Sequence, residues 1–401
     1  MKELGAIALI LITSAGRAQT TWDSRASCPD LGRWGVACFE VDGIGYMVGG
    51  RSGNTDLNEV WAYDPILNEW EQKTSIPGVR RVASGFSIGD KGYVTCGLYE
   101  TTSGRNDLWE YDPIMDTWSE KASLPSEARY GAVGFSLDGL GYVATGATGP
   151  GTGPYVSDLW AYDPVLNQWL ERQSIPDQGR VGAGAFVADG KCFVFGGRQV
   201  DQSMSNELWA YDPISNSWST RAPLPSNGRH YTRVFSAYGK GVIASGQDGV
   251  STFNDCWYYD PGTNGWYGLP DYPGSGGWSG SSMSIHNHVY AGMGQTNGLS
   301  FSDLWTLKDL EIGIDEFPLM PSVRLTPNPC RSGDVITLET PSLHATGVLR
   351  IFDTQGREVA ARPIAPLRQT IELPSLALGL YTCLVSVQGV VKAQAKLEII
   401  E

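Results

Sequence analysis

The sequence has few histidines, little charge and no long apolar segment. Only four of its 401 residues are histidine, and charged residues make up 18% of the chain. No apolar run reaches the roughly 18–20 residues that a membrane-spanning helix requires, so the sequence predicts no transmembrane segment. Histidines and cysteines do not stand at the spacing of metal ligands, and we expect neither a metal site nor a cofactor.

Acidic residues outnumber basic residues. The chain has 29 Lys and Arg against 43 Asp and Glu, which gives a net charge of −14. Because an acidic surface repels phosphate backbones, this balance argues against nucleic acid as a partner.

Glycine and tryptophan are abundant, and the tryptophans mark a repeat. Five copies contain the core Trp-x-Tyr-Asp-Pro, and a second tryptophan follows nine residues after the first. The second tryptophans, at intervals of 48, 51, 49 and 48 residues, are Trp70, Trp118, Trp169, Trp218 and Trp266. A fixed period of this length predicts an array or a propeller.

Each copy predicts four antiparallel strands. In residues 207–211 bulky side chains alternate with others, which favours a strand. The Asp-Pro-x-x-Asn sequence that follows suits a turn, and Trp218 opens the returning strand. Upstream, Asp189-Gly190 predicts a tight hairpin between two further strands.

The repeats resemble the kelch family of β-propellers. The resemblance covers about residues 20–310 and rests on the Tyr–Trp spacing and on Gly-Gly pairs such as Gly196-Gly197. The last repeat lacks a second tryptophan after Trp305, whereas Trp22 stands alone 48 residues before Trp70. We therefore expect an amino-terminal strand to close a six-bladed ring within a propeller domain of residues 19–312.

Residues 1–18 predict a secretory signal peptide. Lys2 precedes an apolar run from Leu4 to Ile12, and small residues lie between Ala15 and Ala18. The alternative is a buried amino-terminal strand.

A second domain is expected over residues 319–401, where the repeat ends and tryptophan is absent. Short apolar runs separated by glycine and proline predict a small Ig-like β-sandwich, so the whole chain is expected to be all-β. The sequences 326–329 (Thr-Pro-Asn-Pro), 351–359 and Leu376-x-x-Gly-x-Tyr resemble the carboxy-terminal sorting domain of the type IX secretion system of Bacteroidetes-type bacteria. This resemblance implies the secretion machinery as a partner and a secreted or outer-membrane surface location reached through the periplasm. An accessory sandwich domain is the alternative.

Seven cysteines leave at least one thiol unpaired in a monomer. Several occupy strand positions where other repeats have small apolar residues, which favours buried thiols over the alternative, disulfides. They are Cys28, Cys38, Cys96, Cys192, Cys256, Cys330 and Cys383.

An arginine recurs eleven residues after the second tryptophan, on the predicted face of variable loops. In propellers of this kind the position lies near the mouth of the central channel, so an anionic ligand is one hypothesis. Ion pairing with an acidic ladder that begins the third strands is the other. The arginines are Arg33, Arg81, Arg129, Arg180 and Arg229, with Gly277 in the sixth copy.

Aromatic residues follow several of these positions. Trp34 and Trp278 belong to neither tryptophan ladder, and Tyr130 and His230 take the equivalent place in two other copies. They predict an aromatic platform that stacks on sugars, and filling of the channel mouth is the alternative.

No catalytic residue is predicted. Neither a copper site of Tyr, Cys and His nor the repeated boxes of sialidases can be assembled from the sequence. We therefore expect an exported binding module with a glycan or protein ligand on its loop face rather than an enzyme. A carbohydrate-active enzyme resembling a sialic-acid mutarotase and a purely structural surface protein are the alternatives.

Overall fold

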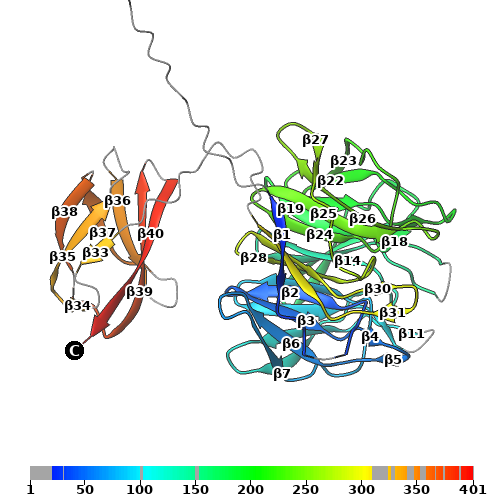
Figure 1. The fold of residues 1–401 in the computed structure, drawn as a ribbon, viewed down its shortest axis with the longest axis horizontal. Helices are drawn as coiled ribbons and strands as arrows, with labels where there is room; N and C mark the ends of the chain where they lie inside the picture. The colour runs from blue at the N-terminus through cyan, green and yellow to red at the C-terminus, as the bar shows by residue number, and fades with distance from the viewer. Residues whose placement is uncertain are drawn as a thin grey trace, which may run out of the picture. The chain divides into compact units, whose positions relative to one another are not determined.

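The computed structural model describes residues 20–29, 31–99, 103–149, 153–308, 324–326, 330–340, 347–352, 358–365, 367–373, 375–387 and 390–400. The chain divides into two compact units, Met1–Ile312 and Gly313–Glu401 (Figure 1). The predicted signal peptide lies outside the described residues. Every regular element of the described ranges is a strand, and none of these ranges contains a helix that could cross a membrane.

The first unit is a ring of six antiparallel four-stranded sheets, which we number as blades one to six (Figure 1). This confirms the prediction of an all-β, six-bladed propeller. From the channel outward, the blades are β2 (Ala37–Val41), β3 (Ile44–Val48), β6 (Val60–Asp64) and β7 (Glu69–Lys73); β8 (Ser84–Ile88), β9 (Lys91–Thr95), β12 (Leu108–Asp112) and β13 (Thr117–Lys121); β14 (Val133–Leu137), β15 (Leu140–Ala144), β16 (Leu159–Asp163) and β17 (Gln168–Arg172); β19 (Gly184–Ala188), β20 (Lys191–Phe195), β22 (Leu208–Asp212) and β23 (Ser217–Arg221); β24 (Arg233–Ala237), β25 (Lys240–Gln247), β26 (Thr252–Asp260) and β27 (Gly265–Leu269); β28 (Ser281–Ile285), β29 (His288–Gly292), β32 (Leu304–Lys308) and β1 (Thr21–Arg25).

The two ends of the first unit meet in blade six. Strand β1 pairs antiparallel with β32, and Trp22 lies opposite Leu307. The Trp22 indole N–H donates to the carbonyl of Pro270 at 2.9 Å, which ties the closing strand to blade five. The position of the isolated Trp22 in the sequence therefore predicted the closure correctly.

The repeated Tyr-Asp-Pro-x-x-Asn-x-Trp sequence links neighbouring blades. In blade four the Tyr211 hydroxyl donates to the Asn216 side chain at 2.8 Å, and the same Asn216 oxygen accepts the backbone N–H of Gln173 from blade three. Trp218 donates its indole N–H to the carbonyl of Gln173 at 2.7 Å. Asn216 adopts a left-handed φ of 48°, which asparagine tolerates better than most residues. Each motif residue thus serves a turn and an inter-blade bond.

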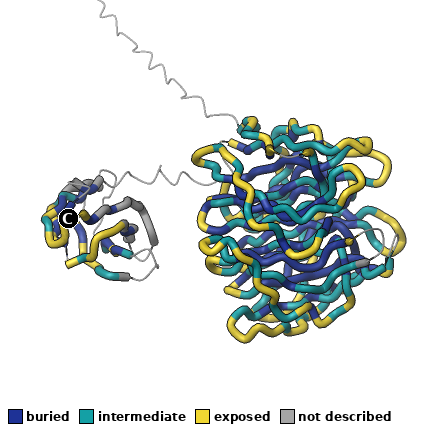
Figure 2. The backbone as a smooth tube through the Cα atoms, turned by 90° about the horizontal axis from the view of Figure 1, so that it is seen from below, coloured by how far each residue is buried: buried dark blue, intermediate teal, exposed yellow. Residues whose placement is uncertain are grey.

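Packing follows the same periodicity. The inner and middle strands are largely buried, whereas the turn tips are exposed (Figure 2). Phe135, Tyr142 and Tyr211, from blades three and four, belong to one buried cluster. The core is therefore distributed around the ring rather than gathered at its centre.

The second unit contains two sheets with a common core. One sheet orders β33 (Arg324–Thr326), β35 (Val335–Thr340) and β38 (Leu367–Glu372); the other orders β34 (Cys330–Arg331), β40 (Val390–Ile400), β39 (Gly379–Val387), β36 (Gly347–Phe352) and β37 (Glu358–Ile364). Ile336 of the first sheet and Leu349 and Val385 of the second are buried in a single apolar cluster. Across both units, the described cysteines form no disulfide.

Candidate functional site

The loop face surrounds the mouth of the propeller channel. Six residues that lead into the inner strands each pair with a residue of the loop between the second and third strands of the same blade. The pairs are Trp34–Arg51, Arg81–Leu98, Tyr130–Ala147, Val181–Arg198, His230–Gln247 and Trp278–Gln295. Short hairpins extend three of these loops: β4 (Arg51–Ser52) with β5 (Thr55–Asp56), β10 (Leu98–Tyr99) with β11 (Ser103–Gly104), and β30 (Gln295–Thr296) with β31 (Leu299–Ser300). In blade four, β18 (Arg180–Val181), which leads into the inner strand, pairs with β21 (Arg198–Gln199) of the loop.

A closed circle of backbone hydrogen bonds sets the diameter of the mouth. The residue after each mouth position donates its N–H to the carbonyl of its counterpart in the preceding blade, over 2.6–2.9 Å. All six residues have φ between 45° and 68°, so the circle depends on left-handed backbone. They are Gly35, Val82, Gly131, Gly182, Tyr231 and Ser279.

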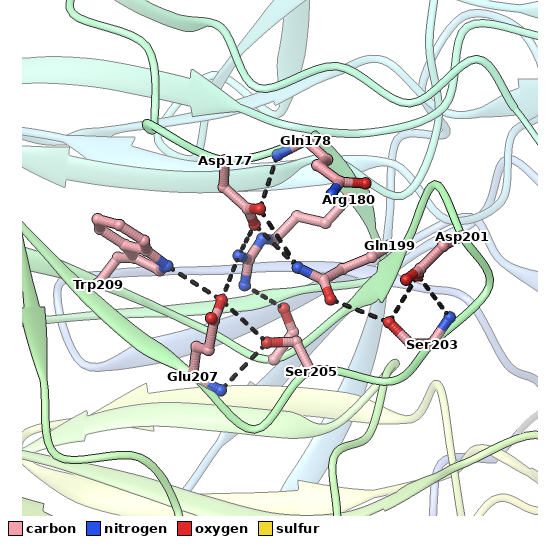
Figure 3. A network of polar contacts seen from close by, with 10 residues as sticks. Asp177, Gln178, Arg180, Gln199, Asp201, Ser203, Ser205, Glu207 and Trp209 are labelled. Carbon is pink, nitrogen blue, oxygen red and sulfur yellow. Dashed lines mark hydrogen bonds and ion pairs between the residues drawn. The ribbon is translucent and has the colours of Figure 1, made fainter.

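The recurring arginines lie behind this circle, buried against the acidic ladder. Arg129 illustrates the arrangement: its guanidinium pairs with Asp158 and donates to the carbonyl of Thr145 at 3.0 Å. Arg33, Arg180 and Arg229 are equally buried and pair with Glu59, Glu207 and Asp255. In blade four Arg180 also contacts Asp177, which in turn accepts from Gln199 (Figure 3).

Arg81 does not belong to this ladder. Arg80 pairs with Asp107 and donates to the carbonyl of Cys96, so Arg80 takes the ladder position in blade two. The turn before it is one residue shorter than in the next blade, where Leu124–Arg129 replaces Ile76–Arg80. Arg81 is thereby shifted to the mouth, with its side chain on Asp56 and its guanidinium 5.9 Å from the Trp34 ring.

Ion pairing is thus the role that the structure shows for the four ladder arginines named from the sequence, Arg33, Arg129, Arg180 and Arg229. Burial opposes ionisation of Asp158 and Asp255, yet hydrogen bonds and charge from Arg129 and Arg229 hold the pKa of each carboxyl below its ordinary value. Ligand binding by the ladder arginines stays a prediction, and their guanidinium groups are already engaged.

Blade six lacks a ladder arginine, and a residue of blade five takes its place. Arg233 is fully buried and donates to the carbonyls of Gly292 and Met293, at 3.0 and 2.5 Å. In the other blades the ladder arginine donates to the carbonyl sixteen residues ahead, and Met293 is sixteen residues after Gly277. The Arg233 guanidinium also lies 4.7 Å from the ring of Tyr272.

The aromatic residues expected at the mouth do come together. Trp34 and Trp278, both half-buried, have ring centroids 5.5 Å apart. Tyr231 joins them to His230, with centroid distances of 5.8 Å to Trp278 and 4.8 Å to His230. Tyr130 packs on the other side of the mouth in a cluster with Ala147, Tyr155 and Val181.

The sequence analysis did not predict three residues that lie at the mouth: Tyr155, Arg198 and Tyr231. The Arg198 guanidinium lies 5.7 Å from the Tyr155 ring, and it makes no ion pair or hydrogen bond with any described residue. Arg198 follows the Gly-Gly pair of blade four just as Arg51 follows that of blade one. A comparison of Arg51 with Arg198 in the sequence could have identified Arg198 as a residue of the mouth.

Four buried polar atoms at the mouth have no hydrogen-bond partner among the described residues. They are Trp34 Nε1, Tyr155 Oη, Arg198 Nε and His230 Nδ1. His230 and Tyr155 are only 5% and 7% exposed, so each of these groups would bear a desolvation penalty if nothing bound it. These groups would gain hydrogen bonds if water or a ligand reached them.

Burial and the nearby charge of Arg198 lower the pKa of His230 to about 4. The imidazole is therefore neutral at pH 7, and Arg198 carries the positive charge of this sector. The unfolded chain protonates His230 at a higher pH than the folded chain does. The free energy of unfolding therefore falls as the pH drops from about 6.5 toward 4.

Comparisons with known proteins agree with the fold. Residues 35–77 match the sequence model of the kelch motif, and residues 136–312 match that of the KLHDC2/KLHL20/DRC7 kelch-repeats domain. An F-box/kelch-repeat protein of Arabidopsis thaliana is 31% identical over 182 residues, which cover 40% of this chain and 38% of that protein. The chain thus spans about two fifths of the length of that curated relative. A solved structure, that of YjhT, has a TM-score of 0.60 at 19% identity over 69% of this chain and 95% of its own. This chain therefore carries kelch repeats in a six-bladed β-propeller, a fold that suggests a binding or interaction module.

Proposed function

We propose that this protein is an exported binding module that holds an acidic saccharide at the mouth of its propeller. The observation that carries the proposal is the group of four unpartnered polar atoms on Trp34, Tyr155, Arg198 and His230. Sugar hydroxyls both donate and accept hydrogen bonds, so a saccharide that reaches such groups can pair with them. The half-buried Trp34 and Trp278 offer indole surface on which the apolar face of a sugar stacks.

The distribution of charge favours a sugar acid over a neutral sugar. Asp56 pairs with both Arg51 and Arg81 and offsets half of their charge. Arg198, across the mouth, has no carboxylate partner among the described residues; it is half-buried, and its guanidinium lies 5.7 Å from the Tyr155 ring. A carboxylate on the ligand would supply that partner through a charge-assisted hydrogen bond.

Calorimetric titration with D-glucuronic acid and N-acetylneuraminic acid tests the proposal, with D-glucose as the neutral sugar. We expect Arg198→Gln to weaken binding of a sugar acid by about tenfold or more, because the ligand carboxylate loses its partner. The matched control is Arg51→Gln, which changes the equivalent position of blade one but removes a guanidinium already paired with Asp56, and it should bind nearly as wild type. Binding should also weaken as salt is added.

The tryptophan pair gives the second arm of this experiment. Trp34→Ala combined with Trp278→Ala should weaken binding of acidic and neutral sugars alike, by about 1–3 kcal/mol. If neither sugar acid binds, or if the wild type prefers a peptide with a free carboxy terminus, the saccharide proposal is wrong. A sharp fall in melting temperature without any sugar binding would instead mean that the indoles only fill the mouth.

Export is the second part of the proposal, and it rests on the two ends of the chain. We propose that residues 1–18 are a signal peptide and that residues 319–401 form an Ig-like sandwich that directs type IX secretion. Among the described residues that support the sorting motif, Tyr381 is buried in the core and donates its hydroxyl to the carbonyl of Ala377 at 2.9 Å. Residues 327–329 and 353–357 of the motif lie outside the described ranges.

Removing residues 319–401 should leave the propeller folded and halt its export. In the native host the shortened protein is expected in the periplasm, whereas the full chain reaches the surface or the medium. Fractionation followed by immunoblotting measures this distribution, and a melting curve of residues 19–312 checks the fold. Shortened protein in the medium would overturn the sorting role.

A further inference from the structure

The hydrogen-bonded circle contains one large side chain in a backbone conformation that disfavours it. Glycine takes three of the six positions, whereas Val82, Tyr231 and Ser279 have φ of 45°, 50° and 53°. Left-handed backbone is unfavourable for residues with a Cβ, and such outliers persist where the surrounding structure or a function retains them. Tyr231 has the largest side chain of the three, so its retention in this backbone conformation calls for a structural or functional reason.

The Tyr231 ring extends across the inside of the circle. A Cβ on Gly182, in blade four, would lie 3.1 Å from ring atoms of Tyr231, and a Cβ on Gly131, in blade three, would lie 3.2 Å from its hydroxyl. On its own side the ring contacts His230 and Trp278. One side chain of blade five therefore reaches along the circle as far as blade three.

Beneath this ring the channel is lined by small residues and is not filled. A cavity of about 110 Å³ lies at the level of the circle, lined by Tyr231, Gly131 and Ala183 among others. A second cavity of about 180 Å³ follows deeper in the channel, where Cys38, Ser84 and Thr232 contribute to its walls. Both cavities belong to the channel that begins at the circle, and the Tyr231 ring lies at its entrance.

We infer that Tyr231 is the specificity-determining floor of the mouth, which makes the site a blind cup for one terminal or free sugar residue. A saccharide chain cannot pass inward along the channel while the ring is in place. The ligand then binds end-on, with its outer residue between the indoles and Arg198. This inference rests on the proposed saccharide function, but the floor itself can be tested without any ligand.

Tyr231→Gly should open the channel without disturbing the circle. Gly35, Gly131 and Gly182 take the same position with φ of 61–68°, and Ser279 takes it with φ of 53°, so Tyr231→Ser is a second permitted opening variant. Tyr231→Phe is the matched control, because it keeps the ring and removes only the hydroxyl. Melting curves establish that each variant is folded.

The first readout is labelling, by methyl methanethiosulfonate and mass spectrometry, of a thiol introduced into each protein by Ala183→Cys, because Ala183 lines both cavities whereas the native Cys38 side chain packs between blades. We expect labelling to be at least tenfold faster in Tyr231→Gly and Tyr231→Ser than in the wild type, and unchanged in Tyr231→Phe. Equal labelling rates in all four proteins would show that Tyr231 does not close the channel.

The second readout compares D-glucuronic acid with a trimer of D-galacturonic acid in calorimetric titrations. The wild type should bind the monosaccharide and the trimer with similar affinity, because only one residue enters the cup, whereas the opening variants should gain affinity for the trimer. Faster labelling of the introduced thiol in the opening variants, with no sugar binding by the wild type, would retain the floor and reject the saccharide function. Tighter binding of the trimer by the wild type would reject the blind cup and retain the saccharide function.

Discussion

Trp22→Ala is expected to lower the free energy of unfolding of the propeller by about 3 kcal/mol. The indole packs edge-on against Tyr272, with centroids 5.3 Å apart, and its N–H bonds to the carbonyl of Pro270. Both contacts hold the closing strand of blade six to blade five. Deleting residues 19–27 should have a larger effect, because β32 would become an exposed edge and the protein would unfold or aggregate.

Chemical denaturation followed by tryptophan fluorescence measures the effect of Trp22→Ala. The control is Ser24→Ala, an exposed position two residues along the same strand, which should leave stability within about 0.5 kcal/mol of the wild type. If the deletion variant melts at the temperature of the full chain, ring closure by β1 contributes nothing to stability.

Arg233→Ala is expected to be the most destabilising single change in the ring, at about 3–5 kcal/mol. Its guanidinium is fully buried and bonds the carbonyls of Gly292 and Met293 together with the hydroxyl of Ser245. Alanine would leave three buried acceptors without a donor and a cavity beside Tyr272. Blade six depends on this residue because it has Gly277 where the other blades have a ladder arginine.

Arg51→Ala serves as the contrast for Arg233→Ala in the same denaturation experiment. Arg51 is a half-buried arginine at the rim, paired with Asp56, and its removal should cost about 1 kcal/mol or less. Equal losses for Arg51→Ala and Arg233→Ala would show that burial of Arg233 has no special importance for blade six.

Much of the fold could be predicted because each blade is built from local, repeated interactions. The Asp-Pro-x-x-Asn turn, the Tyr–Trp spacing and the Asp-Gly hairpin all act within about fifty residues, so their pattern is visible in the sequence. The isolated Trp22 also indicated the pairing between the two ends of the propeller, since a repeat with a missing member shows which strand must return. Trp34, Tyr130, His230 and Trp278 were found for the same reason, by comparing equivalent positions.

The chemistry of the mouth was decided only by the tertiary structure. A turn shortened by one residue exchanges the roles of Arg80 and Arg81, and a count along the sequence does not reveal which of two neighbouring arginines is buried. Arg233 replaces a residue that is missing from another blade, and Tyr231 contacts glycines of blades three and four. Repetition determines which residues take equivalent places, whereas contacts between blades depend on where unlike side chains meet in space.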